Sequence, residues 1–203
     1  MAIITNLSQL DPQGTYSYAD YLNWQFGEMV ELIKGKIFPM SPAPSVRHQS
    51  VSRNLVIGIG HFFKASPCRV FAAPFDVRLY NRARSAQVAQ DIFTVVQPDL
   101  CVVCEVAKLD EQGCLGAPDW IIEVLSPGKN AARDITLKHA LYEENGVREY
   151  WIVYPNDRLI HQFVLTAEAR YQLINVWGGD DLAPARPHLF PDLVLPLADV
   201  FED

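Results

Sequence analysis

Pro118-Asp119-Trp120-Ile121-Ile122-Glu123-Val124-Leu125-Ser126-Pro127 is the segment from which the fold of this chain can be worked out. Apolar residues run almost without a break from 119 to 125, and a second such run extends from Asp99 to Val106. Short, near-continuous apolar runs are typical of strands that are covered on both faces. The connection between them contains Asp110-Glu111-Gln112-Gly113, which is typical of a turn, so we predict an antiparallel pair.

The segment after these strands predicts a helix and a further strand. Ala131 to Asn145 has the clearest helical pattern in the chain, and Gly146 follows as its C-terminal stop. Tyr150 to Tyr154 is another apolar run. A helix that connects two buried strands indicates a βαβ unit.

Further elements are expected on both sides of this unit. Upstream they are a short helix over Thr15 to Trp24 with Ser17 as its cap, a hairpin that pairs Met29 to Ile33 with Lys36 to Met40, a helix over Val46 to Phe63 and a strand over Arg69 to Tyr80. Downstream they are a hairpin that pairs Leu159 to Leu165 with Tyr171 to Val176 and an apolar tail over Phe190 to Phe201. We therefore expect one domain over residues 1–203, of α/β (α+β) class with a mixed sheet.

Length and composition are those of an ordinary globular domain. The chain has 203 residues, of which 49% are hydrophobic and 20% charged, and domains average ~100–200 residues. Met1 to Leu10 lacks the basic region and apolar run of a secretory signal. No apolar stretch approaches the ~20 residues of a transmembrane helix. We expect a cytoplasmic protein with no membrane partner.

The four cysteines are Cys68, Cys101, Cys104 and Cys114. Cys101 and Cys104 form a C-x-x-C, a spacing found in zinc and redox sites. On a strand, however, residues three apart point to opposite faces, and no second C-x-x-C or His pair completes a zinc site. We predict buried, reduced cysteines.

Charge is distributed unevenly along the chain. The net charge is −7, but Leu32 to Gln90 contains nine Lys or Arg residues against one acid, Asp76. This segment therefore carries +8 and the rest of the chain −15. The asymmetry predicts either a side that faces a polyanion or a folded surface on which the two segments intermix.

Two carboxylates lie in the predicted buried strands, where a charged group is unfavourable unless another group compensates it. Glu123 has apolar neighbours on both sides, and Asp99 begins the other strand after Pro98. Burying an unpaired carboxylate is costly, and a divalent cation shared by two of them removes the cost. Hard oxygen ligands of this kind suit Mg²⁺ or Mn²⁺.

Strand spacing indicates which aspartate is the partner of Glu123. Asp119 lies on the same strand, four residues away, which at ~3.3 Å per residue is about 13 Å. Asp99 lies on a different strand and could be ~5 Å away across the sheet. Asp99 is therefore the better ligand, and Asp119 is expected to begin a strand or form a turn.

Asp134, Lys138 and Tyr142 are spaced at i, i+4 and i+8 along one side of the predicted helix. One interpretation is a surface ion pair between Asp134 and Lys138, worth ~0.3–0.5 kcal/mol. The other directs Lys138 at the metal site, where its ammonium would stabilise the charge on a transferring phosphate. Residue spacing alone favours the surface pair.

Three groups of motifs resemble one known family. The first group is Gln97-Pro98-Asp99-Leu100 with Gly116 to Pro127. The second is Arg133-Asp134, Lys138, Tyr142 and Gly146-Val147-Arg148-Glu149-Tyr150-Trp151-Ile152-Val153. The third lies upstream and consists of Glu31-Leu32-Ile33-Lys34-Gly35, Ser41-Pro42 and Arg47-His48-Gln49. With this pattern, which covers the chain from about residue 15 to Phe201, the sequence resembles the Uma-type restriction-endonuclease-like family of the PD-(D/E)xK nuclease superfamily.

The resemblance implies a restriction-endonuclease-like core, a central mixed sheet flanked by helices, with additional N-terminal and C-terminal hairpins. In that superfamily the Asp and the Glu bind Mg²⁺, and a Lys two residues after the Glu assists the attacking water. Asp99 and Glu123 match the acids, but the lysine position is Leu125. The resemblance therefore favours Lys138 as a relocated lysine.

The resemblance also adds two candidate site residues, Glu31 and His48. Glu31 would supplement the metal site, the alternative being a solvent-facing strand residue. His48 would contact phosphate or orient a water, the alternative being a helix cap.

Two functions follow from these expectations. The first is a Mg²⁺- or Mn²⁺-dependent nuclease of DNA, in which Asp99, Glu123 and the carbonyl of Val124 bind the metal and Lys138 acts on water. Arg78, Arg82 and Arg84 would hold the nucleic-acid backbone. The second is a nuclease-like fold that binds nucleic acid or a protein without cutting. No Gly-rich phosphate loop and no G-x-S-x-G motif occurs, which argues against P-loop or Rossmann enzymes and serine hydrolases.

We also expect a homodimer. Phe62, Phe63, Trp151 and Trp177 exceed the aromatics that we can place in one core, and nucleases that cut both strands often act as dimers.

Overall fold

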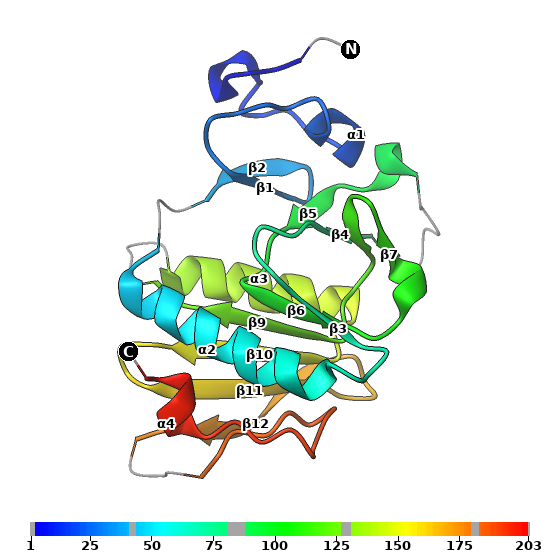
Figure 1. Cartoon of the computed structure of the whole chain (residues 1–203). Helices are drawn as coiled ribbons and strands as arrows, with labels where there is room; N and C mark the ends of the chain where they lie inside the picture. The colour runs from blue at the N-terminus through cyan, green and yellow to red at the C-terminus, as the bar shows by residue number, and fades with distance from the viewer. Residues whose placement is uncertain (1–2, 41–43, 81–87, 127–130, 180–182, 203) are drawn as a thin grey trace.

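The computed structural model describes residues 3–40, 44–80, 88–126, 131–179 and 183–202, and of residues 131–134 only the backbone. Its two six-stranded sheets are the N-terminal sheet, in the order β2-β1-β5-β4-β8-β7, and the central sheet, in the order β12-β11-β10-β9-β6-β3 (Figure 1). In the described residues no helix is both long enough and apolar enough to cross a membrane.

The strands and helices have the following bounds. The N-terminal sheet contains β1 (Val30–Ile33), β2 (Lys36–Pro39), β4 (Val77–Leu79), β5 (Thr94–Val96), β7 (Leu109–Asp110) and β8 (Gly113–Leu115). The central sheet contains β3 (Arg69–Ala72), β6 (Leu100–Val103), β9 (Trp120–Val124), β10 (Glu149–Tyr154), β11 (Leu159–Leu165) and β12 (Tyr171–Trp177). The helices are α1 (Tyr18–Tyr21), α2 (Val46–Phe63), α3 (Ala131–Asn145) and α4 (Leu197–Val200), with short 3₁₀ turns at Leu7–Gln9, Ala89–Asp91 and Val106–Lys108.

The centre of the fold agrees with the sequence prediction. β6 and β9 pair antiparallel, whereas β9 and β10 pair parallel and are connected by α3. α3 ends at Asn145, and Gly146 follows with a φ of 78°, a conformation that glycine adopts without steric cost. α2 also has its predicted bounds, and the two predicted hairpins form.

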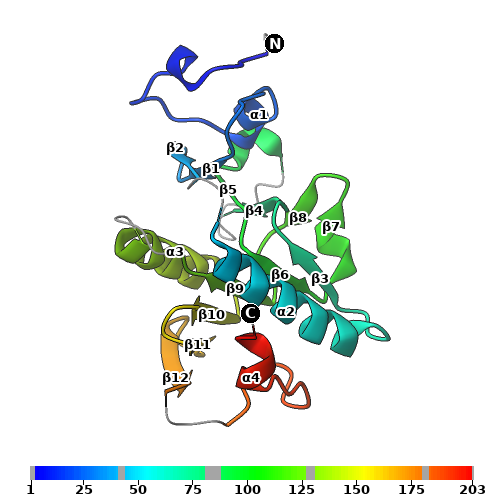
Figure 2. The same cartoon turned by 60° about the vertical axis from the view of Figure 1, so that its left-hand side comes forward.

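Helices α2 and α3 lie on opposite faces of the central sheet (Figures 1 and 2), and an apolar layer covers each face. On one face Leu55 and Ile59 of α2 pack with Trp120 and Ile122 of β9. The C-terminal tail joins this layer through a set of buried residues, which are Leu193, Leu195, Leu197, Val200 and Phe201. The opposite face is covered by α3 together with the N-terminal sheet. A side chain on this second face therefore lies between a helix and a second sheet.

The predicted strand from Arg69 to Tyr80 is wrong. It is two strands in different sheets, since β3 pairs with β6 and β4 pairs with β5 and β8. Pro74 lies between them and has no N–H to donate to a sheet, so the ladder cannot continue through it. β5, which precedes the first predicted acid, was not predicted.

The prediction of four reduced cysteines is also wrong. Cys68 and Cys104 form a disulfide, whereas Cys101 and Cys114 are free and buried. The register of β3 on β6 pairs Arg69 with Val103, which places Cys68 opposite Cys104. Cys101 does point to the other face, as expected for its position on a strand.

A buried carboxylate attaches the tail to the central sheet. Glu149, at the start of β10, is fully buried. Its Oε1 accepts hydrogen bonds from Trp151 Nε1 at 2.7 Å, Gln162 Nε2 at 2.7 Å and the His188 N–H at 3.0 Å. Its Oε2 accepts one from the Leu189 N–H at 2.9 Å. Four donors thus satisfy this carboxylate, and two of them belong to the backbone of the tail.

Candidate functional site

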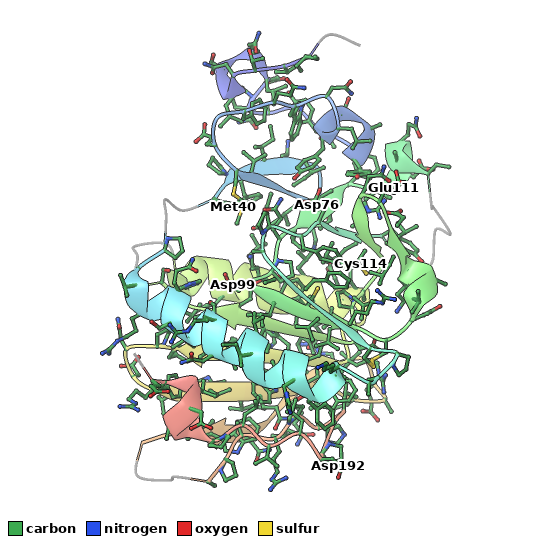
Figure 3. All side chains as sticks on the ribbon, viewed as in Figure 1. Met40, Asp76, Asp99, Glu111, Cys114 and Asp192 are labelled. Carbon is green, nitrogen blue, oxygen red and sulfur yellow. A yellow bond between two sulfur atoms is a disulfide. The ribbon has the colours of Figure 1, made fainter. Side chains whose placement is uncertain are left out.

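Asp99 and Glu123 lie opposite each other on neighbouring strands. β6 pairs Leu100 with Ile122, so the residue before Leu100 faces the residue after Ile122. Asp99 Oδ2 accepts a hydrogen bond from the Val124 N–H at 2.7 Å, which holds the aspartate against β9. Figure 3 shows Asp99 between helices α2 and α3, below the N-terminal sheet. The cross-strand geometry that we predicted for this pair is present.

α3 adds a lysine and a tyrosine to this pair. Lys138 Nζ is 3.0 Å from Glu123 Oε1, and the Tyr142 hydroxyl donates to the same oxygen at 2.6 Å. The two residues are four apart, so both side chains project from one side of α3. Lys138 thus points into the site and not to the surface. The side chain of Asp134 lies outside the described residues.

Glu31 reaches the same lysine from the N-terminal sheet. Its Oε1 lies 3.0 Å from Lys138 Nζ and accepts a hydrogen bond from the Gln97 N–H at 2.9 Å. Gln97 belongs to the short link that takes the chain from β5 to β6 and ends at Asp99. Glu31 is 6% exposed. The solvent-facing alternative for Glu31 is therefore wrong, and the site lies where the two sheets meet.

His48 approaches Asp99 from the first turn of α2. Its Nε2 is 3.4 Å from Asp99 Oδ1, and its Nδ1 is 3.4 Å from Ser52 Oγ. The helix cap is Ser45, whose Oγ accepts from the His48 N–H, so the His48 side chain is not the cap. Burial alone would lower the pKa of His48, but the hydrogen bond and negative charge of Asp99 outweigh it, and the pKa is raised.

Burial and charge shift the pKa values of the central pair. Burial raises the pKa of Glu123 to about 7; Lys138 opposes this increase, and Asp99 and Glu31 add to it. Burial by itself would lower the pKa of Lys138, but the two glutamates more than offset it, and the pKa lies above its ordinary value. Lys138 is therefore an ammonium at neutral pH. As an ammonium it can interact with an anion, but it has no lone pair with which to accept a proton.

Leu125 occupies the position at which the resemblance noted in the sequence predicts a lysine. It lies two residues after Glu123 and packs against the apolar layer on the α3 face. Leu125 and Glu123 thus share a strand face, as their spacing predicts. On this face Lys138 supplies the cation from the following helix.

Two residues differ from the predictions: Arg78 has another role, and Tyr142 was missed. Arg78 is 4% exposed; its Nη2 is 2.6 Å from Asp110 Oδ1, and its guanidinium lies over the Tyr18 ring. It is therefore not available to a nucleic-acid backbone, since it is buried in the N-terminal sheet, and Arg82 and Arg84 lie outside the described residues. Tyr142 was not predicted to bind Glu123, although its spacing from Lys138 was a signal.

Asp119 has the structural role that its spacing suggested. Its Oδ2 accepts from the Cys104 N–H at 2.8 Å, and its Oδ1 is 3.1 Å from Arg148 Nη1. The carboxylate therefore joins the end of β6 to the start of β10, away from Glu123.

The donor set restricts the kind of metal that the site could hold. Among the described side chains, no group of three or more His, Cys, Asp or Glu residues is arranged to hold a metal ion. The arrangement of these side chains therefore differs from that of structural zinc sites, which use four protein ligands. Mg²⁺ is typically bound by one or two carboxylates, with water and substrate oxygens as the other ligands. Asp99 and Glu123 fit that pattern, and Lys138 leaves negative charge uncompensated among Glu31, Asp99 and Glu123.

Comparisons with known proteins agree with this architecture. A model of the Uma2 family, described as "Putative restriction endonuclease", matches residues 18–198. A crystal structure described as that of a putative nuclease belonging to DUF820 from Anabaena variabilis ATCC 29413 has a similar fold, with a TM-score of 0.65. The two sequences are 20% identical, and the match covers 92% of this chain and 97% of the other. The comparison with curated proteins gives no significant match.

Proposed function

The chain belongs to the Uma2 family, and from this membership and the geometry of the acidic site we propose that it is a Mg²⁺- or Mn²⁺-dependent nuclease that hydrolyses phosphodiester bonds of DNA. The observation that carries the proposal is the placement of Asp99 opposite Glu123, with Lys138 bound to the glutamate. The fold is that of a structure described as a putative nuclease, which supports the same class of reaction.

Asp99, Glu123 and the backbone carbonyl of Val124 would hold the metal. The Val124 N–H donates to Asp99 and Val124 directly follows Glu123, so this residue lies next to both carboxylates. When bound, a divalent cation would polarise the phosphate and lower the pKa of the attacking water. The proposal needs no further protein ligand, because substrate oxygens and waters complete such sites.

Lys138 would stabilise negative charge on the phosphate. Its raised pKa keeps it protonated, so it is poorly suited to take a proton from water. An ammonium placed beside the metal-binding glutamate acts instead as a fixed positive charge, the kind of group that lowers the barrier as charge develops. Glu31 and Tyr142 would position this group, because they hold Lys138 and Glu123 respectively.

His48 would orient Asp99. The imidazole Nε2 faces the carboxylate oxygen that is not bound to Val124. A ligand that is fixed by a second residue holds its metal in one geometry, and losing such a residue typically costs about 10–100-fold in metal affinity.

Metal titration of the wild type and of Asp99→Ala tests the site. We expect Mg²⁺ and Mn²⁺ to bind the wild type and to lose most of their affinity for the variant, because one of two carboxylate ligands is gone. Isothermal titration calorimetry measures both. Absence of metal binding in the wild type would exclude the site and the metal-dependent reaction with it. If metal binds, incubation with linear DNA, supercoiled DNA and RNA shows whether the protein cuts and which substrate it prefers.

The affinity for metal is expected to depend on pH. Because the pKa of Glu123 is raised to about 7, a proton competes with the cation at this carboxylate. Affinity should fall about tenfold for each pH unit below roughly 7 and level off above it, since only the ionised form binds metal. Titrations at several pH values measure the slope. A profile without change between pH 6 and 8 would contradict the role of Glu123 as a ligand.

The absence of a lysine at position 125 supports a second function. In this alternative the chain is a degenerate nuclease that binds nucleic acid or a protein without cutting. Lys138 is paired with both Glu31 and Glu123, an arrangement that also serves as a purely structural buried ion network. Metal binding without cleavage of any of the three substrates would favour this alternative.

The homodimer stays a prediction, to be tested by the mass in solution. One of its reasons holds only in part, because Phe63, Trp151 and Trp177 are buried in the core of the single chain, whereas Phe62 is exposed.

A further inference from the structure

A groove at the corner between α2 and β3 gives access to the disulfide. It has a volume of about 540 Å³, and Cys68 lines it together with Lys64 and Arg69. β3 is the last strand of the central sheet, and Figures 1 and 2 show the turn that leads into it at the outside of the molecule. A small molecule in this groove would therefore meet one sulfur of the bond between Cys68 and Cys104.

The lining of the groove favours an anion over a neutral or cationic molecule. Its two charged residues are Lys64 and Arg69, and none of its lining residues is acidic. The remaining lining is mostly apolar and includes Phe63, Phe71 and Val106. A cleft with charges of one sign and apolar walls focuses the electric field and raises the local concentration of an oppositely charged reactant.

The two sulfurs of the disulfide have different surroundings. Cys68 directly precedes Arg69, whereas Cys104 directly precedes Glu105 and donates its N–H to Asp119 Oδ2 at 2.8 Å. An anionic reactant is therefore attracted to the Cys68 side of the bond and not to the Cys104 side. Both acids beside Cys104 are paired with a cation, so they oppose the departure of a Cys104 thiolate only weakly.

The other two cysteines do not supply a nucleophile for this bond. Cys101 and Cys114 are free and buried. Burial raises the pKa of the Cys101 thiol well above its ordinary value and that of Cys114 to about 12. Because the thiolate is the form that attacks a disulfide, neither residue does so at neutral pH. A thiol from outside the chain is needed.

We propose that this groove is a site of thiol–disulfide exchange, at which a small anionic thiol attacks Cys68 Sγ and expels Cys104 Sγ. The sulfur of the incoming thiolate bonds to Cys68 Sγ, and the electron pair of the broken bond goes to Cys104 Sγ, which takes a proton from water. A second thiolate then attacks the sulfur of the bound thiol and releases both as their disulfide, which leaves Cys68 reduced. The two thiols thus supply the two electrons that reduce the protein disulfide.

Cleavage of the disulfide by glutathione, an anionic thiol, and by cysteamine, a cationic one, tests the groove in the oxidised full-length protein. Lys64→Ala/Arg69→Ala should slow glutathione about tenfold at low salt and should not slow cysteamine, because only the anion loses an attraction. The effect on glutathione should shrink at about 1 M salt, where charges are screened within ~3 Å. Alkylation of the freed thiols at successive times, followed by mass spectrometry, measures both rates.

The matched control is Arg170→Ala. Arg170 is an exposed cation that directly precedes β12, at the opposite edge of the central sheet from β3. At that distance its charge is screened, so both rates should stay within about twofold of the wild type.

Two single variants show which sulfur faces the groove. Cys104→Ser and Cys68→Ser both lack the disulfide, so they are matched in that loss. Cys68 in the first variant should form a mixed disulfide with oxidised glutathione about tenfold or more faster than Cys104 in the second, because access and nearby cations increase the reactivity of a thiol. Thermal unfolding checks that both variants fold. If either does not fold, the mixed disulfide trapped during cleavage of the wild type should be found on Cys68.

Three results would overturn the inference. They are a mixed disulfide on Cys104 in place of Cys68, an unchanged rate with glutathione in Lys64→Ala/Arg69→Ala, and a disulfide that glutathione cleaves only when heat has unfolded the protein. None of these measurements uses DNA or a metal ion. A protein that does not cut DNA would therefore leave this inference standing, and failure of the exchange would leave the proposed nuclease standing.

Discussion

Glu123→Gln is expected to lower DNA cleavage by on the order of 10³-fold or more and to leave the fold at least as stable as in the wild type. Glutamine keeps the size and one acceptor oxygen for the Tyr142 hydroxyl, which lies 2.6 Å from Glu123 Oε1. It removes the negative charge that would bind the metal. Because burial, Asp99 and Glu31 all disfavour that charge, its removal also relieves a cost of folding.

Single-turnover cleavage and thermal unfolding measure the two effects. The control is Glu144→Gln, which changes the same residue type at an exposed position of α3, where Glu144 pairs with Lys34. Cleavage by Glu123→Gln within tenfold of the wild type would exclude Glu123 as a metal ligand. Lys138→Ala is a less selective test, because it leaves two buried glutamates without their cation and should lower both stability and activity.

Glu149→Ala is expected to destabilise the protein by about 4–5 kcal/mol. The substitution leaves four buried donors without an acceptor, two of them in the backbone at His188 and Leu189. For a chain of this length that corresponds to a fall in Tm of roughly 10–20 °C. The tail should detach first, because two of the lost hydrogen bonds are those that hold its backbone at His188 and Leu189.

Thermal unfolding and limited proteolysis of the tail check this result. Glu149→Gln should fall between the wild type and Glu149→Ala, because the amide keeps one acceptor oxygen but presents an N–H to the remaining donors. Glu144→Ala, at an exposed ion pair, should cost less than about 1 kcal/mol. A stability of Glu149→Ala within about 1 kcal/mol of the wild type would show that water replaces the carboxylate, contrary to its burial.

Elements with strong local signals were predictable in this chain. α2 and α3 have the bounds that apolar spacing and the stop at Gly146 indicated. The antiparallel pair of β6 and β9 and the βαβ unit also followed from local pattern, because each strand is short, apolar and bounded by turns. β5 was missed, and β3 and β4 were merged, since a three- or four-residue strand has little periodicity of its own.

The candidate site was predictable only in part. Spacing alone selected Asp99 over Asp119, because residues on one strand are separated by fixed distances. Residue spacing favoured a surface ion pair for Lys138 and the family resemblance favoured the acidic site, and the packing of α3 against β9 decided for the site. Tyr142 contacts Glu123, and Glu31 contacts Lys138, although 92 or more residues of sequence separate Glu31 from this pair. No local sequence pattern predicts such a contact.

The sequence by itself determined the local elements and the pair of acids on facing strands. Strand period and helix period depend on neighbouring residues only, so these features can be read from short segments. The tertiary structure decided which sheet each short strand joins, that Cys68 meets Cys104, that Glu149 holds the tail and that a lysine from α3 lies between Glu31 and Glu123. These contacts join segments far apart in the chain, and packing of the whole domain is what brings them together.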